Sequence, residues 1–195
     1  MENIKHHKEK KGSGRGRETL FRVTFNNQIN HIKIADNKAH IIITINTLVI
    51  SVLIGLSGYR NIIEGNIIKS VNIIIPITLI ILSCLLSVVY AIQAARPMLI
   101  KTENMHGFEI KPKDSLIFFG TIQDKTLDAY IAEMDELINS NESIYHTMEI
   151  EIYNQGKVLF RKYKLLNIAY RVFMYGFVFS VLTFLVIFLF SSHII

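Results

Sequence analysis

Long apolar stretches alternate with polar segments along this chain of 195 residues. Three of the stretches contain no Asp, Glu, Lys or Arg, and they occupy residues 39–59, 70–95 and 172–195. A bilayer core of about 30 Å needs about 20 mostly apolar residues in helical form. Each stretch reaches that length. The pattern therefore predicts an all-α membrane protein with three transmembrane helices, and it disfavours a soluble protein with buried core helices.

The polar segment before the first stretch continues the helical pattern. Phe21, Phe25, Ile32, Ala35 and Ala39 recur at spacings of three and four residues, or at their sum. We therefore expect one helix that covers residues 18–40 and continues into the first span at 41–58. A short outer loop at 59–70 should follow, and the Gly- and Ser-rich basic residues 1–17 should form a disordered tail.

The second span, expected at 71–93, should end before Pro97, because proline cannot continue the hydrogen-bond ladder of a helix. Residues 97–123 mix Pro, Gly and β-branched residues, which indicates an ordered loop with at most short strands. Asp124 or Thr126 can then cap an amphipathic helix. Its apolar stripe consists of Leu127, Tyr130, Ile131, Met134, Leu137 and Ile138.

A last helix should begin at about Glu142 and run into the third span at 172–191. The whole segment 94–171 is thus expected to be a helical sensor segment between two spans. Together with residues 18–40 it would form helical extensions of the transmembrane helices, which pack as a stem bundle. The apolar stripes need partners, and we expect these to be one another or a second copy of the chain.

Basic residues set the expected orientation. Nine Lys and Arg residues precede position 41, two lie between 60 and 69, and ten lie between 96 and 171. Cytoplasmic loops carry the excess of Lys and Arg, so the N-terminus and segment 94–171 should be cytoplasmic. Basic residues near anionic lipid head groups explain the pI of about 9.3, so no nucleic-acid partner is expected.

The chain carries no recognisable catalytic signature. It lacks the His-Glu-x-x-His, Gly-x-Ser-x-Gly and phosphate-loop motifs, and its single cysteine, Cys84, lies inside the second span. The seven histidines have no metal-ligand spacing. We expect no enzymatic activity, no metal and no cofactor. The three apolar stretches contain no Asp, Glu, Lys or Arg, which argues against active transport.

Three polar residues near the start of the first span are candidates for a switch. Asn46 shares a helix face with the small residues Ala35 and Ala39, which would let another helix approach closely. In one interpretation this is a packing face. In the other, Asp36, Lys38 and Asn46 take part in a regulated interhelical contact that transmits a cytoplasmic signal to the spans.

The order of several short motifs resembles that of the Pycsar transmembrane effectors, a family of bacterial anti-phage proteins. The resemblance covers about residues 19–190, and no single motif in it is diagnostic. Its motifs are Ala35-Asp36-x-Lys38-Ala39, Asn46, Arg96-Pro97, Leu116-Ile117-Phe118-Phe119-Gly120, the helix with Tyr130 and Met134, Gly156-x-x-Leu159, Lys162-Tyr163-Lys164-Leu165-Leu166 and Ala169-Tyr170.

The resemblance implies a function in antiviral defence by abortive infection. A partner cyclase would make cyclic UMP or cyclic CMP on infection, and this nucleotide would bind the effector. The effector, in the bacterial inner membrane, would then impair that membrane and stop the infected cell. We expect it to act as a homo-oligomer.

The implied ligand needs cations for its phosphate and a flat surface for its base. Candidate phosphate partners are Arg96, Arg161, Lys162, Lys164 and Arg171, and candidate stacking residues are Phe118, Phe119 and Tyr130. The alternative interpretation makes the lysines lipid-interface charges and the phenylalanines core residues. Two other functions also fit the sequence: an ungated membrane channel, or a membrane anchor that recruits a soluble partner.

Overall fold

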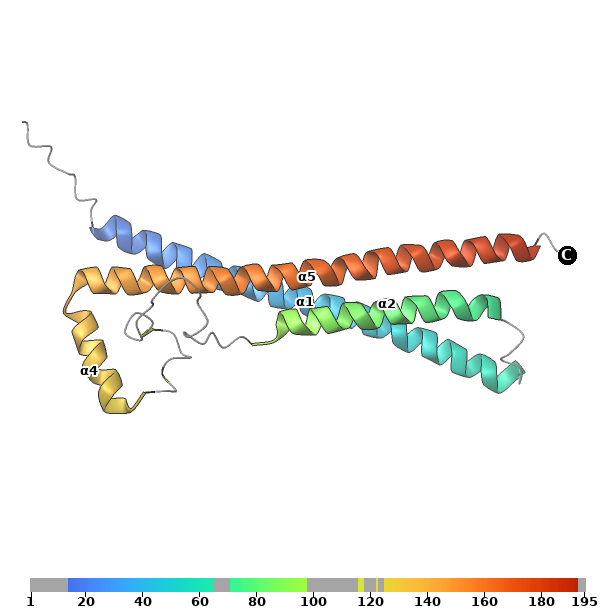
Figure 1. The fold of residues 1–195 in the computed structure, drawn as a ribbon, viewed down its shortest axis with the longest axis horizontal. Coiled ribbons are helices and arrows are strands. Elements are labelled where there is room, and N and C mark those ends of the chain that lie inside the picture. Colours follow the sequence, from blue (N-terminus) through green and yellow to red (C-terminus); the bar gives the residue numbers. More distant parts are fainter. Residues whose placement is uncertain (1–13, 65–70, 98–115, 118–121, 123–124, 193–195) are drawn as a thin grey trace, which may run out of the picture. The chain divides into compact units, whose positions relative to one another are not determined.

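The computed structural model of the protein describes residues 14–64, 71–97, 116–117, 122 and 125–192. In these ranges the chain forms the helices α1 (Gly14–Glu64), α2 (Val71–Ala95), α4 (Leu127–Ile138) and α5 (Asn141–Ser192), and no strand (Figure 1). The all-α prediction is therefore confirmed. The loop predicted at 97–123 lies mostly outside the described residues, as do Phe118 and Phe119.

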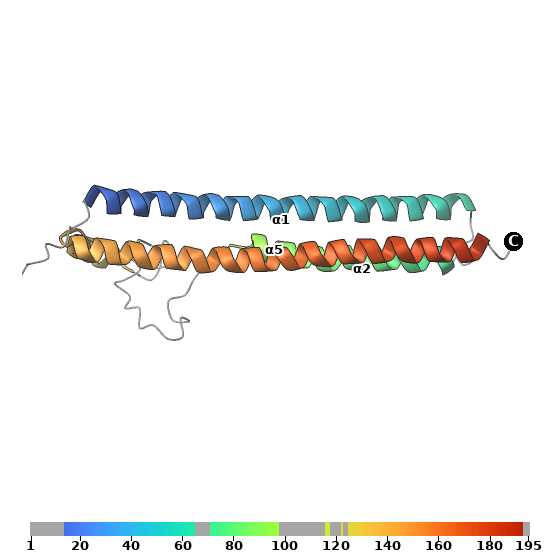
Figure 2. The same cartoon turned by 90° about the horizontal axis from the view of Figure 1, so that it is seen from above.

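The helices divide between two compact units. Unit 1 comprises residues 1–30 and 99–156, and unit 2 comprises residues 31–98 and 157–195. The helices α1 and α5 each contribute residues to both units. Each is drawn as one uninterrupted ribbon in Figure 2.

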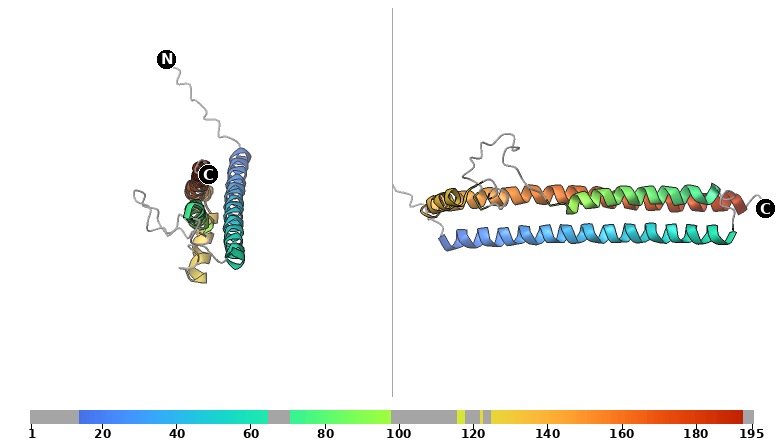
Figure 3. Two further views of the ribbon diagram at one scale, coloured as in Figure 1. Left: turned by 90° about the vertical axis from the view of Figure 1, so that its right-hand side faces the viewer. Right: turned by 90° about the horizontal axis from the view of Figure 1, so that it is seen from below.

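Unit 2 is a bundle of three helices, in which α1 and α5 lie beside α2 (Figure 3). Its core consists mainly of small side chains, namely Ala39, Ile42, Ala91, Ala94, Leu166 and Ala169. Small residues let helix backbones approach closely, which is the usual basis of helix packing in membranes. The helices α2 and α5 approach closely at Gly176, where an added Cβ atom would lie 2.3 Å from the Cβ of Ser83.

Three helices, α1, α2 and α5, are long and apolar enough to cross a membrane. Only 6% of the residues in the most apolar 18-residue window of α5 are buried inside the protein, so most of its apolar side chains are at least partly exposed. Water would strongly disfavour such a surface, whereas lipid tails match it. The prediction of three helices that are long and apolar enough to span a membrane is confirmed, and the bounds of the spans stay a prediction.

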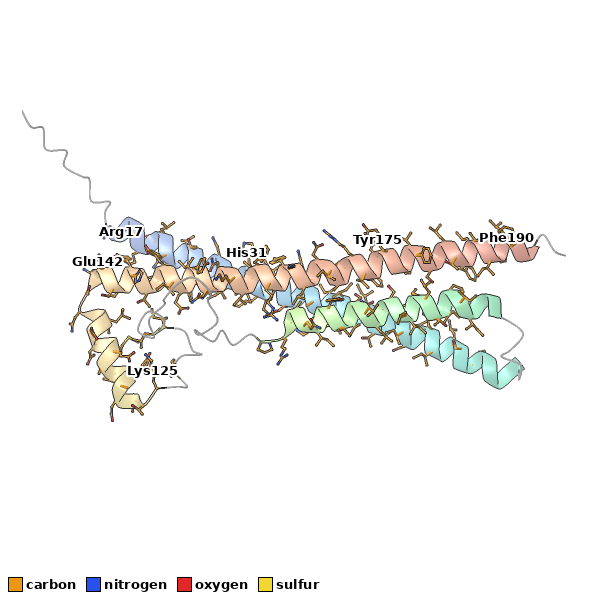
Figure 4. The ribbon with its side chains drawn as sticks, viewed as in Figure 1. Arg17, His31, Lys125, Glu142, Tyr175 and Phe190 are labelled. Atoms are coloured by element: carbon orange, nitrogen blue, oxygen red, sulfur yellow. The ribbon has the colours of Figure 1, made fainter. Side chains whose placement is uncertain are left out.

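Unit 1 contains the first turns of α1, the helix α4 and the first turns of α5. The ring of Phe21 on α1 stacks on that of Tyr145 on α5, with centroids 5.5 Å apart. The Arg17 guanidinium lies 4.8 Å from the centroid of the same Tyr145 ring. In Figure 4, the labelled residues Arg17 and Glu142 mark this end of the two helices.

The ends of α2 and α4 agree with the capping and proline signals in the sequence, but both ends of α1 differ from the predicted boundaries. Thr126 caps α4, since its Oγ1 accepts a hydrogen bond from the Ala129 N–H, and α2 ends before Pro97 as expected. However, α1 begins at Gly14 and continues to Glu64, so it extends into both the predicted tail and the predicted outer loop. Gly58 lies inside this helix and does not end it.

Candidate functional site

One buried lysine joins the three helices of unit 2. The Lys162 Nζ on α5 donates a hydrogen bond of 2.5 Å to the Asp36 Oδ1 on α1. It donates a second, of 3.1 Å, to the backbone carbonyl of Ala94 on α2. We call Asp36, Lys162 and the Ala94 carbonyl the lysine junction.

Electrostatics explain why a lysine can be buried at this point. Lys162 is only 5% exposed, and a buried ammonium is costly unless it is paired and hydrogen-bonded. The Asp36 carboxylate supplies the opposite charge. The Ala94 carbonyl belongs to the last turn of α2, where carbonyls lack a partner inside the helix and where the helix dipole favours a cation.

Lys38 lies beside the junction but contacts other groups. Its Nζ is 5.9 Å from the centroid of the Tyr163 ring, and its backbone carbonyl accepts a hydrogen bond of 3.4 Å from the Tyr170 hydroxyl. The residue is exposed. A cation–aromatic contact at an exposed position contributes about 0.5–1 kcal/mol, so Lys38 is a weaker link between α1 and α5 than Asp36.

A second polar contact crosses the bundle inside the apolar region. Asn46 is fully buried, and its Nδ2 donates to the Ser87 Oγ on α2 at 3.2 Å. The Ser87 Oγ donates in turn to the Ala169 carbonyl on α5 at 2.9 Å. Asn46 therefore makes an interhelical hydrogen bond, and its part in a regulated contact stays a prediction. We call Asn46, Ser87 and the Ala169 carbonyl the asparagine relay.

The described candidates for phosphate binding and for base stacking belong to different units. Four of them are exposed residues of unit 2: Arg96, Arg161, Lys164 and Arg171. Tyr130 is half-buried on α4 in unit 1. None of these five side chains lines a cavity described below, so their role in nucleotide binding stays a prediction.

Unit 1 contains a cavity of about 360 Å³ between its α1 and α5 segments. Its lining combines charged and apolar side chains: Glu18, Arg22, Phe25, Asn26, Ile117, Met148, Glu151 and Ile152. Glu151 is 3% exposed, whereas Glu18, Arg22 and Asn26 are exposed. We call this space the Glu151 cavity. A wider and more polar hollow lies at the start of α5, where Arg17, Tyr145 and His146 contribute to its lining.

The sequence patterns recognised only the apolar part of the Glu151 cavity. Phe25 belongs to the helical stripe expected on α1, but Arg22 and Glu151 were not identified as candidates. Arg22 and Phe25 are three residues apart, a spacing that places two side chains on one helix face. This pair of a cation and an aromatic ring on one helix face was the feature of the sequence that could have indicated a binding site.

Comparison with known protein families shows the family to which the chain belongs. The family model described as the Pycsar effector protein domain matches residues 20–190. The chain belongs to this Pycsar effector family. The match extends over both units and includes the lysine junction, the asparagine relay and most of the Glu151 cavity. No curated protein and no solved structure gives a significant match.

Membership confirms the resemblance that the motifs indicated. Pycsar effectors of this family are anti-phage membrane proteins, and the family implies a cyclic-nucleotide signal. The three apolar helices agree with the membrane part of that description.

Proposed function

We propose that this Pycsar effector is activated by a cyclic pyrimidine nucleotide, cyclic UMP or cyclic CMP, which a partner cyclase makes during infection. The activated protein impairs the integrity of the inner membrane and stops the infected cell. Family membership and the three apolar helices support this proposal. The observation that carries it furthest is that α1 and α5 each belong both to the unit with the cavities and to the unit with the spans.

Continuous helices give a physical route for the signal. Binding in unit 1 changes the packing of the first turns of α1 and α5. Because neither helix is interrupted, a rotation or shift is passed along the same backbone into unit 2. There the lysine junction and the asparagine relay hold α1, α2 and α5 together, and they are the contacts that must rearrange.

The switch obeys a simple thermodynamic condition. A nucleotide shifts the equilibrium only by the difference between its affinities for the resting and active states. Moving a population from 1:99 to 99:1 requires a difference of about 10⁴-fold in affinity. The resting state must dominate without ligand, because the uninfected cell has to tolerate the protein.

The proposed location is the bacterial inner membrane, with the N-terminus and residues 94–171 in the cytoplasm. The distribution of Lys and Arg supports this orientation, since nineteen of the twenty-one lie in the segments assigned to the cytoplasm. That orientation exposes unit 1 to a nucleotide made in the cytoplasm. We further propose that the protein forms a homo-oligomer, because three helices alone enclose no pore.

Thermal unfolding of the purified full-length protein in detergent tests the proposal directly. The samples contain no ligand, cyclic UMP, cyclic CMP, cyclic AMP or cyclic GMP. A ligand at 100 times its Kd should stabilise the protein by about 2.7 kcal/mol, which is readily measured. Stabilisation by a pyrimidine nucleotide but not by the purine nucleotides is the expected result.

Absence of a shift with all four nucleotides would contradict activation by direct binding. Dye uptake by intact cells then separates the two remaining functions. An ungated channel would permeabilise cells without any nucleotide. A membrane anchor would leave the membrane intact whether or not the cyclase product is present.

A further inference from the structure

We propose that the Glu151 cavity is the nucleotide site and that it selects cyclic CMP over cyclic UMP. This inference rests on the proposed function, in which a cyclic pyrimidine nucleotide is the signal. Among the described residues, the cavity brings together one guanidinium, one aromatic ring and one buried carboxylate, from Arg22, Phe25 and Glu151. These three groups correspond to the phosphate, the base and the amino group of the ligand.

The size of the cavity suits a small ligand. Pockets for small molecules have volumes of about 300–1,000 Å³ and are mostly apolar with a few polar groups. At about 360 Å³, the Glu151 cavity lies at the lower end of this range. Its apolar lining comes from both helices, with Phe25 on α1 and Met148 and Ile152 on α5. A flat pyrimidine ring can therefore fit between apolar side chains of two helices.

The lining side chains differ in their exposure to solvent, and this difference sets the orientation in which the nucleotide would bind. Arg22 is exposed, so it can hold the cyclic phosphate where the phosphate remains partly hydrated. Phe25, Met148 and Ile152 are half-buried and can cover the base. Glu151 is 3% exposed and is the most buried group of the lining. The base therefore points inward, with its exocyclic group toward Glu151.

The carboxylate then decides between the two pyrimidines. An ionised carboxylate only accepts hydrogen bonds, and with about four acceptor positions it can serve the protein and a ligand together. Cytosine offers it the N4 amino group as a donor. Uracil would present its O4 carbonyl in the same place, so two acceptors would face each other in a buried site. Sites built for one hydrogen-bond pattern reject the opposite one strongly.

Glu18 provides an additional test of the charge arrangement. It lies four residues before Arg22 and lines the same cavity. Its carboxylate repels an incoming anion, whereas the Arg22 guanidinium attracts it. Removal of Glu18 should therefore strengthen nucleotide binding, whereas removal of Arg22 should weaken it. Opposite effects from two neighbouring exposed residues are not expected from a loss of folding.

The experiment is isothermal titration calorimetry of the full-length protein in detergent with cyclic CMP and with cyclic UMP. The wild type should bind cyclic CMP at least about tenfold more tightly. Arg22→Ala should weaken binding of both nucleotides by about tenfold or more. Arg15→Ala is the matched control, because it removes the same charge from an exposed position of α1 outside the cavity lining.

Glu151→Gln tests the selection itself. The amide has nearly the same shape, and it can turn to donate a hydrogen bond to the uracil O4. This variant should lose most of the preference for cyclic CMP while still binding a nucleotide, and a folded circular dichroism spectrum confirms that it remains structured. Retention of the full preference would overturn the role of Glu151.

The outcomes separate this inference from the function on which it rests. If the wild type binds neither nucleotide, the proposed function fails. If the wild type binds but Arg22→Ala and Glu151→Gln behave like it, the nucleotide site lies elsewhere and only the cavity assignment fails. Tighter binding of cyclic UMP by the wild type would overturn the selection.

Discussion

Lys162 and Asp36 are 126 residues apart in the sequence, yet the Nζ of one lies 2.5 Å from the Oδ1 of the other. The same Nζ also bonds to the Ala94 carbonyl, so one side chain connects all three helices of unit 2. Any relative movement of α1 and α5 at this level must stretch or break this contact. A change in the relative position of these helices therefore has an electrostatic cost at the lysine junction.

Asp36→Ala should abolish nucleotide-dependent membrane damage while the protein remains inserted. The variant leaves the Lys162 ammonium buried with only a carbonyl partner, and loss of one member of a buried pair costs about 3–5 kcal/mol at most, less where the carboxylate is partly exposed. Dye uptake by cells with the cyclase product measures the damage, and membrane fractionation verifies insertion. Damage equal to that of the wild type would remove Asp36 from the mechanism.

Two further variants distinguish the loss of the charge pair from a general loss of stability. Asn37→Ala changes the neighbouring exposed position and should behave as the wild type. The double variant Asp36→Leu with Lys162→Met replaces both charges by apolar groups, which is often close to neutral for stability. Recovery of stability without recovery of gating would show that the junction serves the switch rather than the fold.

Asn46→Leu should alter the assembly or the gating of the protein. The variant removes the bond to Ser87 and disconnects the asparagine relay; interhelical hydrogen bonds of this kind contribute on average about 0.6 kcal/mol. Light scattering of the detergent complex gives the oligomer size, and flux through vesicles gives the activity. Thr47→Val, at the adjacent exposed position, is the control. Unchanged size and activity in Asn46→Leu would reduce Asn46 to a packing residue.

Gly176→Ala should destabilise the contact between α2 and α5. Its new Cβ would lie 1.6 Å from the Oγ and 2.3 Å from the Cβ of Ser83, so the two helices must move apart. Overpacking of this kind costs about 1–3 kcal/mol. Thermal unfolding in detergent measures the loss of stability.

The control for Gly176 is another glycine of the membrane region. An added Cβ at Gly55 meets no atom within 4 Å, so Gly55→Ala should leave the unfolding temperature unchanged or raise it slightly. The pair Gly176→Ala with Ser83→Gly should restore part of the lost stability. Equal effects of Gly176→Ala and Gly55→Ala would contradict the close approach of α2 and α5.

Sequence periodicity predicted the buried face of α1 correctly but not its partners. Ala35, Ala39 and Asn46 were expected on one face, and all three are buried. The pattern could not show that Asn46 meets Ser87, because helical spacing specifies which face is buried and not which helix covers it. Lys162 is the clearest case, since its interpretation as a surface charge or phosphate partner did not anticipate its pairing with Asp36.

The cavity was harder to anticipate for a different reason. On α5 the buried stripe continues through Thr147, Glu151 and Asn154, which are all polar. A search for apolar residues at helical spacing does not register such a stripe. The turn signals were more informative: Thr126 caps α4 and Pro97 follows the end of α2, because both effects are local and need no tertiary partner.

The most direct test of nucleotide gating uses the full-length protein in liposomes loaded with a self-quenched dye. Cyclic CMP, cyclic UMP, cyclic AMP and cyclic GMP are added in turn to the outside of vesicles in which unit 1 is accessible. A nucleotide-gated effector predicts dye release on addition of a cyclic pyrimidine nucleotide and retention of the dye in every other sample. Release without any nucleotide, or no release with either cyclic pyrimidine nucleotide, would contradict it.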